Sequence, residues 1–217
     1  MSNDARVDDA TLLTAWVDGD ADAGATLVRR HYRSIYLFLF SKVGDQVAQD
    51  LTQVVFQRLC EKRRNFRGDA SVRTYLFGIA RWTLVHHHRS ARSEARAFDP
   101  ATEPLDVPDA VSSMTSQLAA RQEEVLFVHG MRELPLDDQI ILELKYYDAM
   151  TVRELAAVFD VPRATMADRI ARARARLQSE IARLGPSAKI VESTISGLDA
   201  HMQAVRAHLA ARMSAKA

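Results

Sequence analysis

Apolar residues recur at steps of three and four along most of the chain, which is the spacing of one face of an α-helix. In the first part this pattern predicts four helices, at about residues 9–18, 22–42, 46–64 and 71–91. Gly19, Gly44 and the stretch 65–69 around Gly68 separate them. The strict alternation and strand-turn-strand signals of β-structure are not convincing anywhere. The pattern therefore predicts an all-α protein.

A second set of helices follows, and its last two form a helix-turn-helix. Thr151 and Glu154 have the spacing of a capping box, in which each side chain satisfies an unpaired amide at the start of a helix. This short helix ends near residue 160, and Pro162 suits the first turn of the next one. The apolar seam of that longer helix consists of Met166, Ile170, Ala173, Leu177, Ile181 and Leu184.

Two further segments complete the predicted organisation. Residues 93–116 contain prolines and acidic residues and bury too little apolar surface to fold alone, so they are expected to form an extended linker between the lobes 9–92 and 117–184. After Gly185 and Pro186, residues 187–217 carry apolar side chains at alternating steps of four and three. This amphipathic helix is expected either to dock on its own chain, the preferred reading, or to pair with a copy of itself or another protein.

Composition limits the classes of function. The chain has 217 residues, 47% of them hydrophobic and 26% charged, with a net charge of only +1, so nucleic-acid binding would depend on local clusters of charge. No run of about 18 apolar residues predicts a membrane span, and no signal peptide is expected at the N-terminus. The single cysteine, Cys60, fits a reducing cytoplasm and is expected to be a small core residue.

The last helix of the second lobe carries the clearest chemistry. At roughly 100° per residue, Ala164, Asp168, Ala171 and Ala175 lie opposite the apolar seam. Arg169, Arg172 and Arg176 line one side of this small-residue face, and Arg163 and Arg174 line the other. Small residues allow close approach to base edges while guanidinium groups bind phosphates, so the pattern favours a DNA major groove. A solvated amphipathic helix is the alternative.

In the first lobe, aromatic residues alternate with arginines around residues 66–89. Flat rings can stack on unpaired bases while cations follow the backbone, which is typical of single-stranded DNA binding. The run His86, His87 and His88 invites a metal interpretation, but neighbours on a helix point about 100° apart, so we expect neither a metal site nor a cofactor.

Several motifs in this order resemble the sigma-70 family, specifically the compact extracytoplasmic-function type of bacterial sigma factor. In the first lobe the motifs are DLTQVVF at 50–56, FRG at 66–68 and SVRTYLFGIAR at 71–81. In the second lobe they are LP at 134–135, LELKYY at 142–147, TVRELA at 151–156 and the run around 164–174. The chain departs from the family's pattern at Trp82, where asparagine is common, and at Ala164, Ala167 and Asp168.

The resemblance implies partners and roles. It implies a factor that binds core RNA polymerase and promoter DNA, melts the −10 element and contacts the −35 element, with an anti-sigma factor as a candidate partner and no membrane insertion. By this resemblance, Asp50, Gln53 and Phe56 are expected to bind core RNA polymerase. Contact with the −10 element falls on Asn65, Arg67, Ser71, Arg73, Thr74, Arg81, His88 and Arg89. Contact with the −35 element falls on Arg163, Thr165, Asp168, Arg169, Arg172, Arg174 and Arg176.

Two alternatives remain open at this point. A dimeric helix-turn-helix regulator would use the C-terminal seam for pairing and would not dock on polymerase. A metal-dependent hydrolase would use the histidine cluster. The sigma-factor interpretation predicts that the protein has no enzymatic activity and is located in the cytoplasm.

Overall fold

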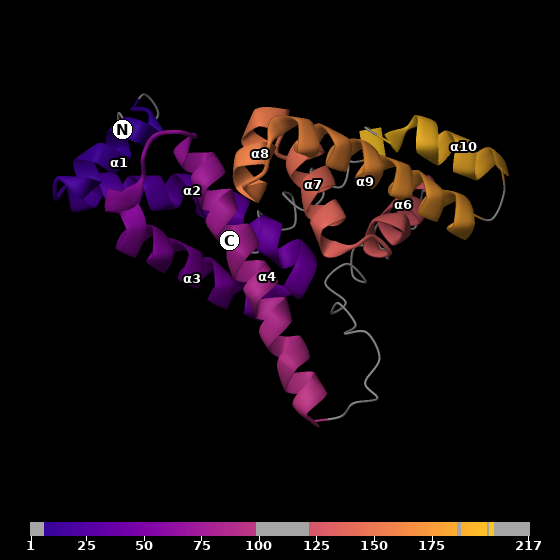
Figure 1. The fold of residues 1–217 in the computed structure, drawn as a ribbon, viewed down its shortest axis with the longest axis horizontal. Coiled ribbons are helices and arrows are strands. Elements are labelled where there is room, and N and C mark those ends of the chain that lie inside the picture. The colour runs from indigo at the N-terminus through magenta and orange to yellow at the C-terminus, as the bar shows by residue number, and fades with distance from the viewer. Residues whose placement is uncertain (1–6, 99–121, 186–187, 199, 202–217) are drawn as a thin grey trace. The chain divides into compact units, whose positions relative to one another are not determined.

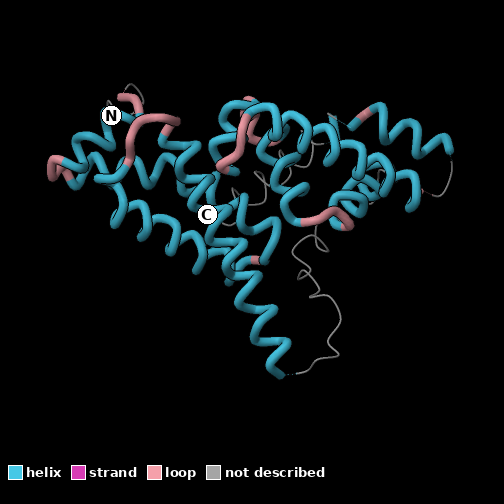
Figure 2. Tube along the Cα trace, viewed as in Figure 1, coloured by secondary structure: helices cyan, strands magenta, loops and turns pink. Residues whose placement is uncertain are grey.

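The structure, a computed structural model, describes residues 7–98, 122–185, 188–198 and 200–201 (Figure 1). The described elements are all helices joined by short loops, without a strand among them, which confirms the predicted all-α class (Figure 2). The chain divides into two compact units, residues 1–110 and 111–217. Each unit has its own apolar core.

The first unit consists of α1 (Asp9–Val17), α2 (Ala21–Val43), α3 (Asp45–Lys62), the short 3-10 helix η2 (Arg63–Asn65) and α4 (Val72–Phe98). α2 packs against α1, α3 and α4, and α3 also packs against α4. Phe38 of α2 meets Phe77 of α4 edge to face, with ring centroids 5.5 Å apart, and both rings are fully buried. Aromatic pairs prefer this geometry, so it locks α4 onto the unit.

Local signals account for the helix boundaries of this unit. The Asp20 side chain caps α2 by accepting from the amides of Asp22 and Ala23 at 2.9 and 3.0 Å. Gly44 links α2 to α3 with φ +79°, a backbone conformation that a side chain would strain. Ser71 accepts from the amide of Thr74 at 3.1 Å at the start of α4.

α4 is longer than the sequence pattern predicted. The expected end near residue 91 is wrong, because the helix continues through Phe98 into the segment assigned to the linker. Residues 91–97 are mostly alanine, arginine and glutamate, which favour helix. The rest of the predicted linker, residues 99–116, lies outside the described residues.

Replacement of two glycines inside helices of the first unit by alanine is expected to change stability in opposite directions. A Cβ on Gly24 would lie 2.5 Å from the Trp16 ring, whereas a Cβ on Gly78 would meet nothing within 4 Å. We expect Gly24→Ala to destabilise the unit by about 1–2 kcal/mol through overpacking. Gly78→Ala should stabilise it by up to about 1 kcal/mol through helix propensity. Urea unfolding followed by tryptophan fluorescence measures both, since Trp16 and Trp82 lie in this unit; equal shifts of the same sign would contradict the assigned packing.

The second unit consists of α6 (Gln122–Arg132), α7 (Leu136–Tyr146), α8 (Val152–Phe159), α9 (Arg163–Leu184) and α10 (Ala188–Ser196). α9 packs against each of the other four. Met166, Ala173, Leu177 and Ile181 of the predicted seam are buried, while Ile170 and Leu184 are half-buried. Gly130 of α6 allows the two backbones to approach, because a Cβ there would lie 3.0 Å from Ile181.

The helix-turn-helix has the predicted caps. The Thr151 hydroxyl accepts from the amide of Glu154 at 3.2 Å, and the Glu154 carboxylate accepts from the amide of Thr151 at 2.8 Å, so the capping box is confirmed. Asp160 then turns the chain with φ +52°. Pro162 precedes the first helical residue of α9 and occupies the N-cap position, one residue before the predicted first turn.

α10 packs on its own chain, as predicted for the C-terminal amphipathic helix. It packs against α6 and α9. Thr194 is fully buried, and Val191 and Ile195 are half-buried; Leu198, two residues after the end of α10, is also fully buried. The remainder of the heptad pattern, from Met202 on, lies outside the described residues. Within the described part of the chain, no helix is both long and apolar enough to cross a membrane.

Candidate functional site

The face of α9 that the sequence assigned to DNA is exposed. Ala164, Asp168, Ala171 and Ala175 lie on it, with Arg163 and Arg172 exposed beside them, and Arg169 and Thr165 half-buried. The Arg172 Nε donates to the carbonyl of Asp168 at 3.3 Å. This contact lies within α9 and does not involve the two terminal nitrogens of the Arg172 guanidinium. This surface of small residues and guanidinium groups can enter a groove of DNA.

Two of the predicted DNA-binding arginines also contact α7. Arg174 donates to the Tyr146 hydroxyl at 2.6 Å, and its guanidinium lies over the Tyr146 ring at 5.8 Å. Arg176 forms an ion pair with Asp138 at 2.5 Å. The Asp138 carboxylate is nearly buried in the first turn of α7, where the helix dipole favours a negative charge. Within the described part of the chain, Arg163 and Arg172 are thus exposed without a contact to α7, whereas Arg174 and Arg176 contact α7, and the Arg176 side chain is still 53% exposed.

The residues assigned to the −10 element occupy two environments. Asn65, at the end of η2, and Arg67 and Ser71, in the loop before α4, are exposed. Thr74 is buried, and its hydroxyl lies 2.8 Å from that of Ser71, so these two residues form the start of α4. Arg73 is half-buried with its guanidinium 5.5 Å from the Phe77 ring.

Further along α4, Arg81 and His88 are half-buried and share one face, since seven residues bring a helix back to within about 20°. Arg89 is exposed on another face. Arg89 and its neighbours on that face form a surface that we call the α4 stripe. Its residues are Tyr75, Gly78, Trp82, His86 and Arg89. These five residues lie within about 40° of the direction of Trp82.

The α4 stripe contains the most exposed large aromatic side chain of the described residues. Trp82 is 48% exposed, stacks on the His86 ring at 5.0 Å, and lies 4.0 Å from the Arg58 guanidinium of α3. Tyr75 contacts Phe66 of the preceding loop at 5.4 Å. The steps of three and four between the stripe residues could have identified this surface from the sequence, which had indicated only a general mixture of aromatics and arginines.

The three consecutive histidines do not converge on one point. His86 stacks on Trp82, while the rings of His87 and His88 meet edge to face at 5.8 Å. Among the described residues, no group of three or more histidine, cysteine or carboxylate side chains could hold a metal ion. The expected absence of a metal stays a prediction.

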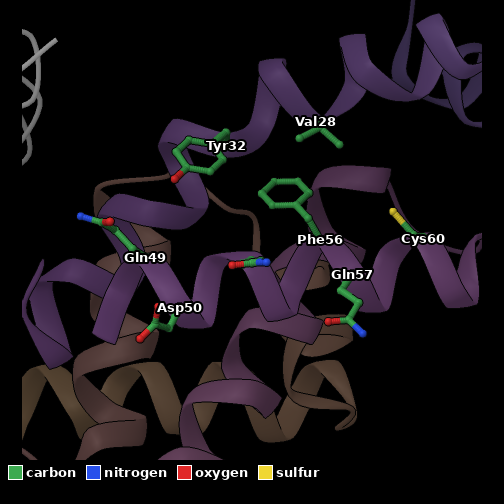
Figure 3. A pocket seen from close by; sticks show the side chains of 8 residues that line it. Val28, Tyr32, Gln49, Asp50, Phe56, Gln57 and Cys60 are labelled. Atoms are coloured by element: carbon green, nitrogen blue, oxygen red, sulfur yellow. The ribbon is translucent and has the colours of Figure 1, made fainter. Parts of the chain in front are cut away.

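A groove of 660 Å³ runs between α2 and α3. Two of the residues that the sequence assigned to polymerase docking, Asp50 and Gln53, are exposed at this groove, and the third, Phe56, is buried in its floor. Figure 3 shows the Phe56 ring of α3 beside the Tyr32 ring of α2. Their centroids are 6.0 Å apart, and Tyr32 is 42% exposed. The remaining lining residues are Val28, Gln49, Gln57 and Cys60.

Neighbouring contacts hold the groove's aromatic wall. Tyr32 stacks on Tyr36 at 6.3 Å, and the Tyr36 hydroxyl donates to Asp45 at 2.5 Å. Burial, followed by this hydrogen bond, raises the pKa of the Tyr36 hydroxyl above its ordinary value. Cys60 is half-buried and lines the groove, so the expectation that it is a core residue is wrong. Cys60 is only half-buried because it lies on the side of α3 that lines the groove between α2 and α3.

Comparison with known proteins matches both units. Residues 27–94 match the family model for sigma-70 region 2, and residues 126–177 match that for sigma-70 region 4. The RNA polymerase sigma-H factor of Pseudomonas aeruginosa is 31% identical over 165 residues, which cover 72% of this chain and 84% of that protein. The ECF RNA polymerase sigma-E factor of Escherichia coli is 23% identical over 182 residues, covering 81% and 95%.

Two solved structures share the fold. CnrH, in complex with the cytosolic domain of CnrY, has a TM-score of 0.60 at 20% identity and covers 82% of this chain and 99% of that one. The sigma factor RpoE of Bartonella quintana, in complex with the anti-sigma factor NepR, has a TM-score of 0.54 at 21% identity and covers 73% and 95%. The chain belongs to the sigma-70 family of RNA polymerase sigma factors and is of the extracytoplasmic-function type.

Proposed function

We propose that this sigma factor binds core RNA polymerase through the groove between α2 and α3 and directs initiation at promoters. In this proposal the loop before α4 and the α4 stripe hold the melted −10 strand, and the exposed face of α9 contacts the −35 duplex. The α4 stripe carries the proposal, because it places an exposed tryptophan and an exposed arginine on one helix face. Stacking on an aromatic ring contributes about 1–3 kcal/mol per unpaired base.

Melting then follows from differential binding, without a chemical step by the sigma factor. Extracting a base from a duplex costs a few kcal/mol. Stacking on Trp82 and contact of Arg89 with the backbone supply a free energy of similar size, and only the open strand makes both contacts. The chain thus acts as a binding factor in the cytoplasm, where we place it together with polymerase.

The groove between α2 and α3 has the composition of a protein-binding site. Tyr32 and Phe56 supply an aromatic centre, while Gln49, Gln53, Gln57 and Asp50 form a polar edge. Interfaces of this type concentrate binding energy in central aromatic residues surrounded by a polar rim. We assign polymerase docking to this groove and extend the predicted set by Tyr32.

We also propose that a regulatory protein binds this chain. The solved relatives CnrH and RpoE are each held in complex with another protein, in the second case an anti-sigma factor. The dimeric regulator alternative loses its main support, because the described part of the C-terminal seam packs on α6 and α9 of the same chain.

Replacing Trp82 by Ala is expected to reduce open-complex formation about 5- to 150-fold, which corresponds to the loss of about 1–3 kcal/mol of base stacking. Trp82→Phe should retain part of the effect because it keeps an aromatic face. Fluorescence of 2-aminopurine in the −10 element reports the opening. Trp16→Phe is the matched control, since Trp16 packs against Gly24. Unchanged opening with Trp82→Ala would remove this residue from the proposed −10 surface.

A further inference from the structure

Asp168 places a negative charge on the exposed face of α9, the face that we assign to the −35 duplex. Ala164 lies about one turn before it and Ala175 about two turns after it, both within about 40° of its direction. Both alanines are exposed, and their methyl groups form no hydrogen bonds with base edges. Between these two alanines, Arg172 is the other polar side chain within this angle. Hydrogen bonding from this face to bases therefore rests on few groups, and the Asp168 carboxylate is the acceptor among them.

The Asp168 carboxylate is available to a ligand. The backbone carbonyl of Asp168 accepts from the Arg172 Nε, but no donor among the described residues bonds to the carboxylate itself. Two other carboxylates of the second unit differ in this respect. Glu180 and Asp138 each form an ion pair with an arginine of α9, at 2.8 and 2.5 Å. Asp168 is thus an exposed carboxylate on the recognition face that keeps its acceptor oxygens for a partner outside the chain.

A carboxylate on a surface that meets DNA requires a donor from a base. Phosphate oxygens repel it, and removing it from water is costly unless a hydrogen bond replaces those to water. In the major groove the base donors are the amino groups of cytosine N4 and adenine N6, whereas guanine and thymine present acceptors. Adenine also places its N7 acceptor beside the amino group, where it repels the second carboxylate oxygen. Cytosine is therefore the base that best matches an aspartate.

We propose that Asp168 determines part of the promoter specificity of this chain by accepting a hydrogen bond from the N4 amino group of a cytosine in the −35 element. The small side chains of Ala164 and Ala175 allow α9 to approach the base edges, and their methyl groups suit thymine methyl groups at neighbouring base pairs. Arg172, one turn after Asp168, offsets the repulsion between the carboxylate and the phosphates. The inference rests on the proposed contact of α9 with the −35 duplex and adds the base that this face selects.

The test uses the full-length chain to select duplexes from a pool randomised over one helical turn, about 10 base pairs, followed by sequencing of the bound DNA. For the wild type we expect cytosine to be preferred at one position by about fivefold or more, the lower end of the discrimination that base contacts provide. Asp168→Asn should change the preference at that position to adenine, because asparagine pairs with adenine N6 and N7. Asp168→Ala should abolish the preference there and leave the other positions unchanged.

Asp160→Asn is the matched control, because it removes the same charge from the turn that precedes α9. Asp160 is exposed and has φ +52°, a conformation that asparagine adopts readily. This variant should keep the base preferences of the wild type. All three variants should stay folded, since both aspartates are exposed, and thermal unfolding checks this point.

The outcomes that contradict the inference are distinguishable from a failure of the proposed function. If Asp168→Asn and Asp168→Ala bound every duplex more tightly with unchanged base preferences, Asp168 would act only by repelling phosphate, and the contact of α9 with the −35 duplex would stand. A preference for a base other than cytosine at the position that responds to Asp168→Ala would also overturn the inference. If the wild type selected no sequence, the proposed −35 contact would fail, and the role of Asp168 with it.

Discussion

Replacing Tyr32 and Gln53 together by Ala is expected to weaken binding to core RNA polymerase by about two orders of magnitude or more. Truncating a central interface residue costs about 2 kcal/mol or more. Tyr32 has this position because its exposed ring stacks on buried Phe56 in the floor of the groove. The fold should survive, since both replaced side chains are exposed. Titration of labelled protein with core polymerase measures the effect.

Gln46→Ala is the matched control for this experiment. Gln46 is exposed on α3, as Gln53 is, but it does not line the groove. Its replacement should leave polymerase affinity within about twofold, which is typical of surface substitutions away from an interface. If the double variant and the control bound polymerase equally well, docking would have to be assigned to another face of the first unit.

Arg172→Ala and Arg176→Ala are expected to differ, although the sequence placed both on one side of the recognition helix. Arg172 is exposed, and its loss should remove one charged contact with DNA, worth about 1.5–3 kcal/mol. The slope of log affinity against log salt should fall by about 0.9 for the lost phosphate. Arg176 is paired with Asp138, so its loss should leave the salt slope nearly unchanged.

Arg176→Ala should instead lower the free energy of unfolding of the second unit by about 1 kcal/mol, because it leaves the nearly buried Asp138 carboxylate without its partner. Binding of a −35 duplex at several salt concentrations, together with urea unfolding of each variant, separates the two roles. A steep loss of salt dependence with Arg176→Ala would show that this arginine leaves Asp138 to contact phosphate.

Local patterns in the sequence predicted the features that depend on local physics. The capping box of Thr151 and Glu154 and the buried seam around Met166 and Leu177 were confirmed, because both follow from spacing along one helix. The end of α4 was misplaced because the acidic and proline-rich composition after residue 98 was extended back over residues that favour helix.

Features that depend on contacts between helices were not available from spacing. The partners of Arg174 and Arg176 lie 28 and 38 residues away along the chain, on α7. The contact of Arg58 with Trp82 likewise joins two helices. Such pairs arise from how helices pack, so the arginines could be assigned to a face of α9 but not divided into those that contact α7 and those that do not.

The measurement that tests the account most directly is transcription in vitro with purified core RNA polymerase and DNA fragments that carry candidate promoters. With the wild-type chain we expect transcripts from defined start sites that core polymerase alone does not produce. The Tyr32 and Gln53 double variant should give none, while Gln46→Ala should behave as the wild type does. Stable DNA binding by the chain alone, with no association with polymerase and no promoter-directed transcript from any fragment, would contradict the account.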